Sequence, residues 1–201
     1  MNKTEVQATV KLGGKRERTR ARLIEAMLEL AAEKGLAAAS LDAIAARAGM
    51  TKGAIYSNFA SRSALLIEAR ATRGLNLVPP SIPGGSFADH MRDIAEQLLV
   101  ILARAPAEAR LIGEYHLQAL TDPELHAQVE ADYGRVLGQA GRKISRGFGE
   151  VLTMPPETMT IAIQSLALGF LHQSLLTPRT VTREVALAAF EALAKGAVRE
   201  G

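Results

Sequence analysis

The chain of 201 residues contains no cysteine and no tryptophan, and aromatic residues make up only 4% of it. The lack of cysteine excludes disulfide bonds, thiolate metal ligands and a cysteine nucleophile. No apolar run approaches the roughly 20 residues of a membrane-spanning helix, and residues 1–14 lack the apolar core of a signal peptide. We therefore expect a soluble cytoplasmic protein with no membrane partner.

The chain is also poor in strand-forming residues, and Ala, Leu, Glu and Arg dominate it. Apolar residues recur at helical spacing along most of its length, which predicts an all-α fold of about nine helices. Residues 78–86, VPPSIPGGS, hold three prolines and two glycines and cannot continue a helix. We therefore expect a flexible arm over residues 1–14, one domain over residues 15–77 and a second domain over residues 78–201.

The most informative stretch is residues 40–62, SLDAIAARAGMTKGAIYSNFASR. Ser40 is placed to cap a short amphipathic helix, and Gly49 accepts the positive φ of the corner that ends it. Thr51 caps a second short helix, residues 51–58. Ile55 and Phe59, four positions apart, turn their apolar side chains toward the core. The other side chains of this helix are small, hydroxylated, amide-bearing or basic, as suits the major groove of DNA. The pattern predicts a helix-turn-helix motif with residues 51–58 as the recognition helix.

Over roughly residues 16–70 the sequence resembles the DNA-binding domain of TetR-type transcriptional regulators. The resemblance is carried at fixed spacing by Gly35, Ser40-Leu41, Ile44-Ala45, Ala48-Gly49, Thr51, Gly53, Ile55-Tyr56, Phe59, Ser61-Arg62 and Leu65-Leu66. It departs from the family at two positions: Asn58 stands where His or Tyr is usual, and Arg62 where Lys is more frequent. The resemblance implies a helix-turn-helix head, a helical ligand-binding and dimerisation body, and a homodimer.

Two kinds of DNA contact are expected, because base edges carry the sequence information and phosphates fix position. Thr51 and Lys52 are the candidates for base edges, and Ala54 is placed to touch a thymine methyl group. The hydroxyl of Tyr56 suits a phosphate; alternatively Tyr56 is a core residue with a hydrated hydroxyl, and Lys52 a solvated charge. The expected contacts are Arg16, Arg18, Ser40, Thr51, Lys52, Gly53, Ala54, Tyr56, Ser57, Asn58 and Arg62.

A basic run, KRERTRAR, opens the first predicted helix, residues 15–34. Such a run is either a solvated helix end or a contact to phosphates or the minor groove, and its place ahead of the motif favours contact. Residues 1–80 hold 13 Lys and Arg against 7 Asp and Glu, a net charge of +6. Residues 81–201 hold 11 against 14, a net charge of −3. This asymmetry alone could be chance, but it suits a DNA-binding head on a non-binding body.

The last two predicted helices, from Pro155 to Leu176 and from Thr182 to Val198, are the expected dimer interface. Residues 161–171, IAIQSLALGFL, are apolar nearly all round, so this helix must be buried on more than one side. The TetR resemblance implies that these helices pair across a dimer; the alternative is burial within one monomer, and we expect a mixture of both. The candidate interface residues are Leu166, Gly169, Phe170 and Phe190.

By the same resemblance the body holds a pocket for a small hydrophobic or amphipathic effector. The candidate lining residues are polar groups on otherwise apolar helices: Tyr115, His116, Gln118, Gln164 and His172. Each could instead be an ordinary hydrogen-bonded side chain. His126 and Glu130 are interpreted as a surface pair and not as metal ligands, because no third ligand is evident. No cofactor and no metal are expected.

The glycines of the helix predicted over residues 122–148 have two interpretations. They weaken the helix, or they allow a close approach to another helix. The sequence alone does not separate these alternatives.

The function that these features favour is a homodimeric transcriptional repressor that binds a palindromic operator and is released by a small hydrophobic ligand. The alternatives are a transcriptional activator and a helical adaptor or ligand-binding protein without specific DNA binding. An enzyme is not expected, because no nucleophile elbow, phosphate-binding glycine loop or metal-ligand cluster is present.

Overall fold

The computed structural model describes residues 14–73, 85–104 and 106–199. These residues form nine α-helices, one 3₁₀ turn and a single isolated β-bridge between Leu152 and Val198, which confirms the all-α fold. The chain separates into two compact units, Met1–Thr72 and Arg73–Gly201. The expected arm, apart from Gly14, and most of the Pro- and Gly-rich segment at 78–86 lie outside the described residues.

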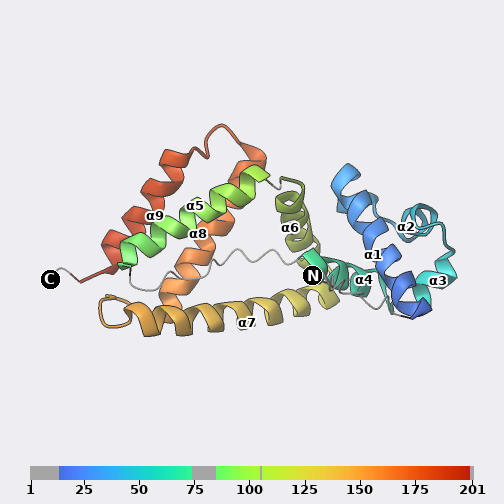
Figure 1. Ribbon diagram of the computed structural model, residues 1–201, viewed down its shortest axis with the longest axis horizontal. Helices are drawn as coiled ribbons and strands as arrows, with labels where there is room; N and C mark the ends of the chain where they lie inside the picture. Colours follow the sequence, from blue (N-terminus) through green and yellow to red (C-terminus); the bar gives the residue numbers. More distant parts are fainter. Residues whose placement is uncertain (1–13, 74–84, 105, 200–201) are drawn as a thin grey trace, which may run out of the picture. The chain divides into compact units, whose positions relative to one another are not determined.

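The first unit is built from four α-helices and one 3₁₀ turn (Figure 1). They are α1 (Lys15–Lys34), the 3₁₀ turn η1 (Leu36–Ala38), α2 (Leu41–Arg47), α3 (Lys52–Tyr56) and α4 (Arg62–Arg73). Gly35 ends α1 with φ 85°, a conformation that favours glycine. Each helix contributes apolar side chains to one core; the largest fully buried ones are Leu23, Met27, Leu36, Ile44, Ile55, Leu65 and Leu66.

The described residues of the second unit form five helices: α5 (Phe87–Arg104), α6 (Pro106–Ala119), α7 (Pro123–Phe148), α8 (Pro156–Leu176) and α9 (Arg183–Ala197). Side-chain caps begin two of these helices. Ser86 and Asp89 bond each other reciprocally at the start of α5. The Asp122 carboxylate accepts from the backbone N–H groups of Glu124 at 3.0 Å and Leu125 at 3.1 Å at the start of α7. These caps supply partners to N–H groups that a helix leaves unpaired.

Helix α8 is the central helix of this unit, because it packs against α5, α6, α7 and α9 (Figure 1). This confirms that it is buried on more than one side. By length and composition α8 alone, among the described helices, could cross a membrane, a test that the core helix of a helical bundle also passes. This corrects the expectation that no apolar run approaches that length.

Two details fix how the helices of the second unit meet. Helices α5 and α9 pack side by side, and ion pairs join Arg92 to Glu191 at 3.2 Å and Arg183 to Glu96. A Cβ on Gly141 of α7 would lie 3.6 Å from the hydroxyl of Thr160 on α8, so these helices approach closely there. Gly134 and Gly147 face open space, so close packing accounts for only one part of the glycines in α7.

Candidate nucleic-acid interface

The local hydrogen bonds of the first unit form the predicted helix-turn-helix. The Ser40 hydroxyl accepts from the Ala43 N–H at 3.2 Å and begins α2, and the Thr51 hydroxyl accepts from the Ala54 N–H at 3.3 Å and begins α3. Gly49 has φ 62° in the turn between them, a left-handed conformation that an L side chain rarely adopts. Both caps and the glycine corner are therefore confirmed.

Helix α3 has one buried face and one exposed face. Ile55 and Phe59 are 1% and 4% exposed and pack into the core of the unit. Tyr56, by contrast, is 59% exposed, and Ala54 is half-buried. Of the contacts expected within the motif, those that are exposed are Ser40, Thr51, Lys52, Gly53, Tyr56 and Ser57.

Lys52 is exposed but has a partner within the motif. Its ammonium forms an ion pair with the Asp42 carboxylate at 2.7 Å. The hydrogen bond to Asp42 and the negative charge of that carboxylate raise the pKa of Lys52 above its usual value. Both side chains are at least half exposed, so water screens the pair, and a phosphate oxygen could replace the carboxylate at little cost.

Three arginines that the sequence placed near DNA bond to the protein instead. Arg62 donates from Nε to the Ala39 carbonyl at 2.9 Å and from Nη2 to the Leu36 carbonyl at 2.7 Å. Its guanidinium thus ties the start of α4 to η1 and the residue after it. Arg22 donates to the Ala48 carbonyl at 2.6 Å, and Arg20 donates to the Asn58 carbonyl.

Asn58 is placed differently from the expected DNA contact. Its side-chain N–H groups donate to the Ala54 carbonyl at 2.8 Å and to the Ser57 hydroxyl at 3.2 Å. Its Oδ1 is buried and has no hydrogen-bond partner among the described residues. The amide is therefore turned back onto the end of α3, and we remove Asn58, like Arg62, from the set of candidate contacts.

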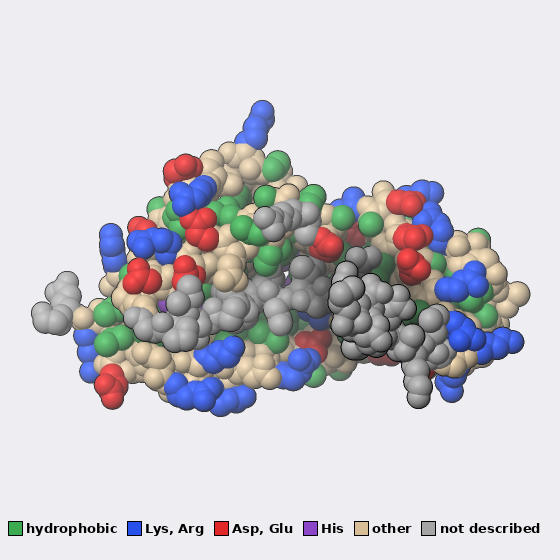
Figure 2. Space-filling model, in the orientation of Figure 1, with side chains coloured by type: hydrophobic (Ala, Val, Ile, Leu, Met, Phe, Trp, Pro, Cys, Tyr) green, Lys and Arg blue, Asp and Glu red, His purple; other side chains and the backbone are tan. Residues whose placement is uncertain are grey.

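Arg16 and Arg18 are exposed in the first turn of α1. That turn lies near the end of α3, because Arg20, one turn further on, bonds to the Asn58 carbonyl. Lys and Arg side chains gather on the visible face of the unit around this end (Figure 2). The structure thus brings the basic start of α1 and the exposed face of α3 to the same region.

In the second unit, three polar rings from three helices come together. The Tyr133 hydroxyl lies 3.3 Å from Nε2 of His116, and the ring centroids of His116 and His172 are 6.3 Å apart. All three are half-buried, whereas Tyr115, whose ring also lies beside His116, is only 1% exposed. We call His116, Tyr133 and His172 the ring cluster.

The sequence missed Tyr133 because α7 has few apolar residues, and nothing local shows which helix its ring faces. The other two expected lining residues, Gln118 and Gln164, are half-buried on α6 and α8. His126 and Glu130 are both exposed on α7. Within the described residues no group of three or more His, Asp or Glu side chains could hold a metal ion.

The four expected interface residues fall into different environments. Gly169 is exposed, and nothing lies within 4 Å of a Cβ built on it. Leu166 and Phe170 are half-buried against the core of the unit. Phe190 is wholly buried, with its ring stacked on Phe170 at 6.1 Å between centroids. Its place in the core of one monomer corrects the expectation that Phe190 contacts a second copy.

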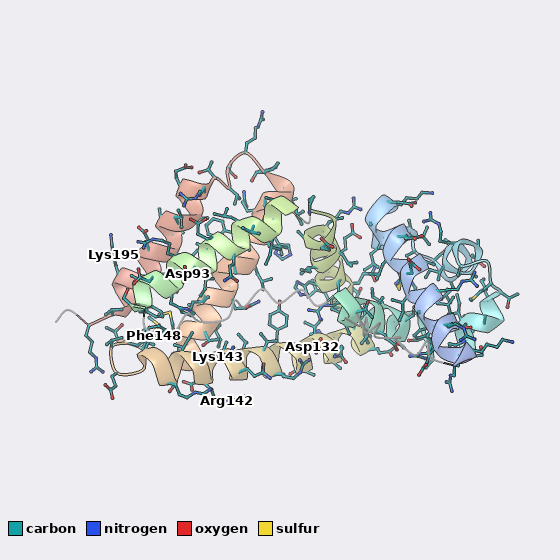
Figure 3. The ribbon with its side chains drawn as sticks, in the orientation of Figure 1. Asp93, Asp132, Arg142, Lys143, Phe148 and Lys195 are labelled. Carbon is teal, nitrogen blue, oxygen red and sulfur yellow. The ribbon has the colours of Figure 1, made fainter. Side chains whose placement is uncertain are left out.

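His90 is a further titratable group of the second unit that the sequence did not single out. It is 8% exposed, and its ring stacks on Phe148 at 5.4 Å between centroids. Burial lowers the pKa of His90 below its ordinary value of 6.5, and the negative charge of Asp93 offsets part of this effect. Figure 3 labels Asp93 on α5 and Phe148 at the end of α7.

Two short capped helices, joined by a glycine turn and with one exposed face on the second, form a helix-turn-helix in the first unit. The family model for bacterial regulatory proteins of the tetR family matches residues 23–69. Over these residues, which contain α2, α3 and the turn between them, the chain is similar to that family.

Individual proteins are also similar to this chain. The HTH-type transcriptional regulator SrpR of Pseudomonas putida is 40% identical over 63 residues, which are 31% of this chain and 30% of SrpR. The match thus spans under a third of that curated relative.

Two solved structures share the fold over nearly the whole chain. NalD, the secondary repressor of the MexAB-OprM multidrug efflux pump in Pseudomonas aeruginosa, is 23% identical, covers 90% or more of both chains (93% and 99%) and has a TM-score of 0.69. The multidrug binding protein EbrR complexed with proflavin is 22% identical, covers 87% of this chain and 99% of its own, and has a TM-score of 0.66.

Proposed function

We propose that the protein is a repressor that binds DNA through the exposed face of α3. The observation that carries the proposal is the set of small, hydroxylated and basic side chains on that face, opposite the buried Ile55 and Phe59. Gly53 leaves the backbone open to a groove, and Thr51, Lys52 and Ala54 are placed for base edges. Arg16, Arg18, Ser40, Tyr56 and Ser57 complete the proposed contact set, mostly toward phosphates.

We further propose that the protein acts as a homodimer on a palindromic operator. A five-residue recognition helix reads only a few base pairs, so two copies are needed for tight and specific binding. The exposed face of α8 supports a second copy as the partner, because beyond Glu157 in its first turn it carries no charge. From Ile161 onward its exposed residues are Ile161, Ser165, Gly169, Gln173 and Leu176. Half-buried Leu166 and Phe170 would add contacts at its border.

The ring cluster supports a small ligand as the signal that releases DNA. Two imidazoles and a phenol offer hydrogen bonds beside aromatic surfaces, which suits a hydrophobic or amphipathic compound with one polar end. Tyr115, Gln118 and Gln164 belong to the proposed lining together with His116, Tyr133 and His172. Binding would shift the protein toward a form with lower affinity for the operator, by the coupling that links two sites on one protein.

The test of DNA recognition is selection of binding sites from random duplex DNA by the purified protein at near-physiological salt. We expect an enriched palindrome. The double variant Tyr56→Ala with Lys52→Ala should lose the enrichment, whereas Leu120→Ala with Lys143→Ala, two exposed changes on the second unit, should retain it. Binding without sequence preference would favour the adaptor alternative.

The test of ligand release uses proflavin, the compound held by EbrR, as a fluorescent probe. We expect the probe to bind and to lower affinity for the selected duplex, and His172→Ala to weaken both effects while operator binding without the probe is unchanged. Release of DNA by the probe from the His172→Ala variant at unchanged concentration would place the ligand elsewhere. A reporter gene behind the operator decides between repression and activation.

A further inference from the structure

The guanidinium of Arg20 connects three helices of the first unit. It forms a two-point ion pair with the Glu68 carboxylate on α4, with Nε donating to Oε1 at 3.3 Å and Nη2 bonded to Oε2. Its Nη1 donates to the backbone carbonyl of Asn58, directly beyond α3. The carbon Cζ also lies 4.2 Å from the ring centroid of Phe59, a cation–π contact.

These contacts meet a need of the recognition helix. Helix α3 has only five residues, too few internal hydrogen bonds to fix its own direction, and the turn of Ser57 and Asn58 follows it. Arg20 supplies a donor to the Asn58 carbonyl and covers Phe59, the apolar residue that anchors the end of α3 in the core. The direction of α3 therefore depends on where the Arg20 guanidinium is held.

Glu68 determines that position. The planar guanidinium meets both oxygens of one carboxylate, a geometry that fixes orientation as well as distance. The two side chains are 27% and 38% exposed, so the pair is only partly open to water. Because Glu68 lies on α4, a displacement of α4 would carry the guanidinium with it and change its hold on the end of α3.

We propose that Arg20 is a positioning residue, and that the Arg20–Glu68 pair links the orientation of the recognition helix to α4. This inference rests on the proposed function, in which α3 reads DNA. The guanidinium of Arg20 binds two groups of the protein: the Asn58 carbonyl in the turn after α3 and the Glu68 carboxylate on α4. Arg20 thus acts through α3 and not by contact with a phosphate.

A direct phosphate contact by Arg20 makes the opposite prediction for Glu68→Gln. If Arg20 bonds phosphate, loss of the competing carboxylate frees a positive charge and strengthens binding to every duplex. If Arg20 positions α3, Glu68→Gln weakens binding to the operator and leaves binding to random-sequence duplex nearly unchanged. The sign of the change therefore separates the two roles.

The experiment compares Glu68→Gln, Arg20→Lys and Arg20→Met with the parent full-length protein, on the selected operator and on a random duplex. We expect the ratio of the two affinities to fall by about tenfold in all three, the size of one lost base contact. Arg20→Lys keeps the charge but lacks the planar fork, so it should not restore the ratio.

Arg47→Met is the matched control. Arg47 on α2 pairs with Glu29 and Glu33 on α1, and its side chain is 30% exposed. Its loss should leave the affinity ratio within about twofold of the parent, because base contacts are not moved. A fall in the ratio equal to that of Glu68→Gln would overturn the positioning role of Arg20.

A measurement without DNA separates failure of this inference from failure of the proposed function. We expect hydrogen exchange at the amides of Ser57, Asn58 and Phe59 to be faster in Glu68→Gln than in Arg47→Met, because their acceptors lie in α3. Faster exchange in a protein that binds no duplex would support the link and overturn the proposed function. Unchanged exchange, or tighter binding of both duplexes by Glu68→Gln, would overturn the link.

Discussion

At the scale of single residues, the arginines of the first unit differ in what their guanidinium groups touch. Arg20, Arg22 and Arg62 each donate to a carbonyl just beyond the end of a short helical segment, those of Asn58, Ala48 and Ala39. Such carbonyls have no partner within their own helix, and a charged donor makes a stronger hydrogen bond to them than a neutral one. Arg16 and Arg18 are exposed on α1 and stay in the proposed DNA contact set.

Gly53 allows a test of the recognition face that does not disturb the fold. A Cβ at this position would meet only the Thr51 hydroxyl, at 3.6 Å, an ordinary contact. Gly53→Ala should therefore keep or slightly raise the melting temperature, since alanine favours a helix over glycine. The added methyl group would stand between α3 and the bases, so affinity for the operator should fall roughly tenfold, as for one lost base contact.

The matched control is Gly134→Ala, at an exposed glycine of α7 with nothing within 4 Å of its Cβ. It should raise the melting temperature without changing operator affinity. Thermal unfolding and a duplex titration of both variants make the comparison. Unchanged operator affinity in Gly53→Ala would show that this part of α3 does not approach DNA.

His90 predicts an acid sensitivity of the second unit. Because burial lowers its folded pKa below 6.5, the unfolded chain binds more protons than the folded one as pH falls through 6.5. The stabilisation from neutral His90 is thus complete above that pH and is lost as the pH falls toward the folded pKa. His90→Phe, which keeps a ring against Phe148, should reduce the fall in melting temperature between pH 7.5 and about pH 5.5.

His126→Gln, a change at an exposed histidine of α7, serves as the control and should leave the pH dependence of the melting temperature as it is in the parent. The measurement is a series of melts by circular dichroism at constant ionic strength. An equal fall in melting temperature for His90→Phe and the parent would assign the acid sensitivity to other groups.

At the scale of elements, helix boundaries could be predicted because their causes are local. Ser40, Thr51 and Asp122 cap the helices that follow them, and Gly35 and Gly49 end the helices before them, all within four residues along the chain. The hydroxyl or carboxylate and the N–H that it accepts from are close in sequence, so the pattern of residues is sufficient.

Side-chain partners could not be predicted, because they depend on which helices meet. Nothing near Arg62 in the sequence shows that it reaches Ala39, 23 positions earlier. Phe190 has the composition of an interface residue, and only the packing of α5, α8 and α9 shows that it is buried in one monomer. Tyr133 was missed for the same reason. The motif was therefore predicted more completely than the contacts that hold it.

The start of α7 gives a prediction at this scale. Asp122 accepts from two backbone N–H groups that open a helix of 26 residues. Asp122→Ala should destabilise the second unit by about 1 kcal/mol, the usual cost of a lost N-cap. Asp122→Ser should retain most of that stability, because serine also caps helices.

Urea unfolding of the two Asp122 variants measures the difference in the free energy of unfolding. Operator affinity should be the same in both, because α7 belongs to the second unit and the proposed DNA contacts to the first. Equal stability of Asp122→Ala and the parent would mean that the cap contributes nothing measurable to α7.

At the scale of the whole molecule, the exposed face of α8, which carries no charge from Ile161 to Leu176, predicts a dimer that a single charge can separate. A side chain on Gly169 would meet open space in the monomer, so Gly169→Glu should fold normally. The same carboxylate would lie unpaired in an apolar interface, which is costly. We expect a monomer in sedimentation velocity and a loss of operator binding.

Gly147→Glu, at an exposed glycine on α7 that also faces open space, is the control and should remain a dimer. Neither variant should have a melting temperature below that at which a single subunit of the parent unfolds. A dimer that persists in Gly169→Glu would move the interface away from this part of α8.

Three arginines that bond to the protein change what the net charge of the first 80 residues means for DNA binding. Residues 1–80 have a net charge of +6, but this total includes Arg20, Arg22 and Arg62, whose guanidinium groups already bond to protein. Only cations that move onto phosphates displace condensed counterions, and each contributes about 0.9 to the slope of log affinity against log salt. The salt dependence of operator binding should therefore reflect far fewer counterions than the basic composition of the first 80 residues suggests.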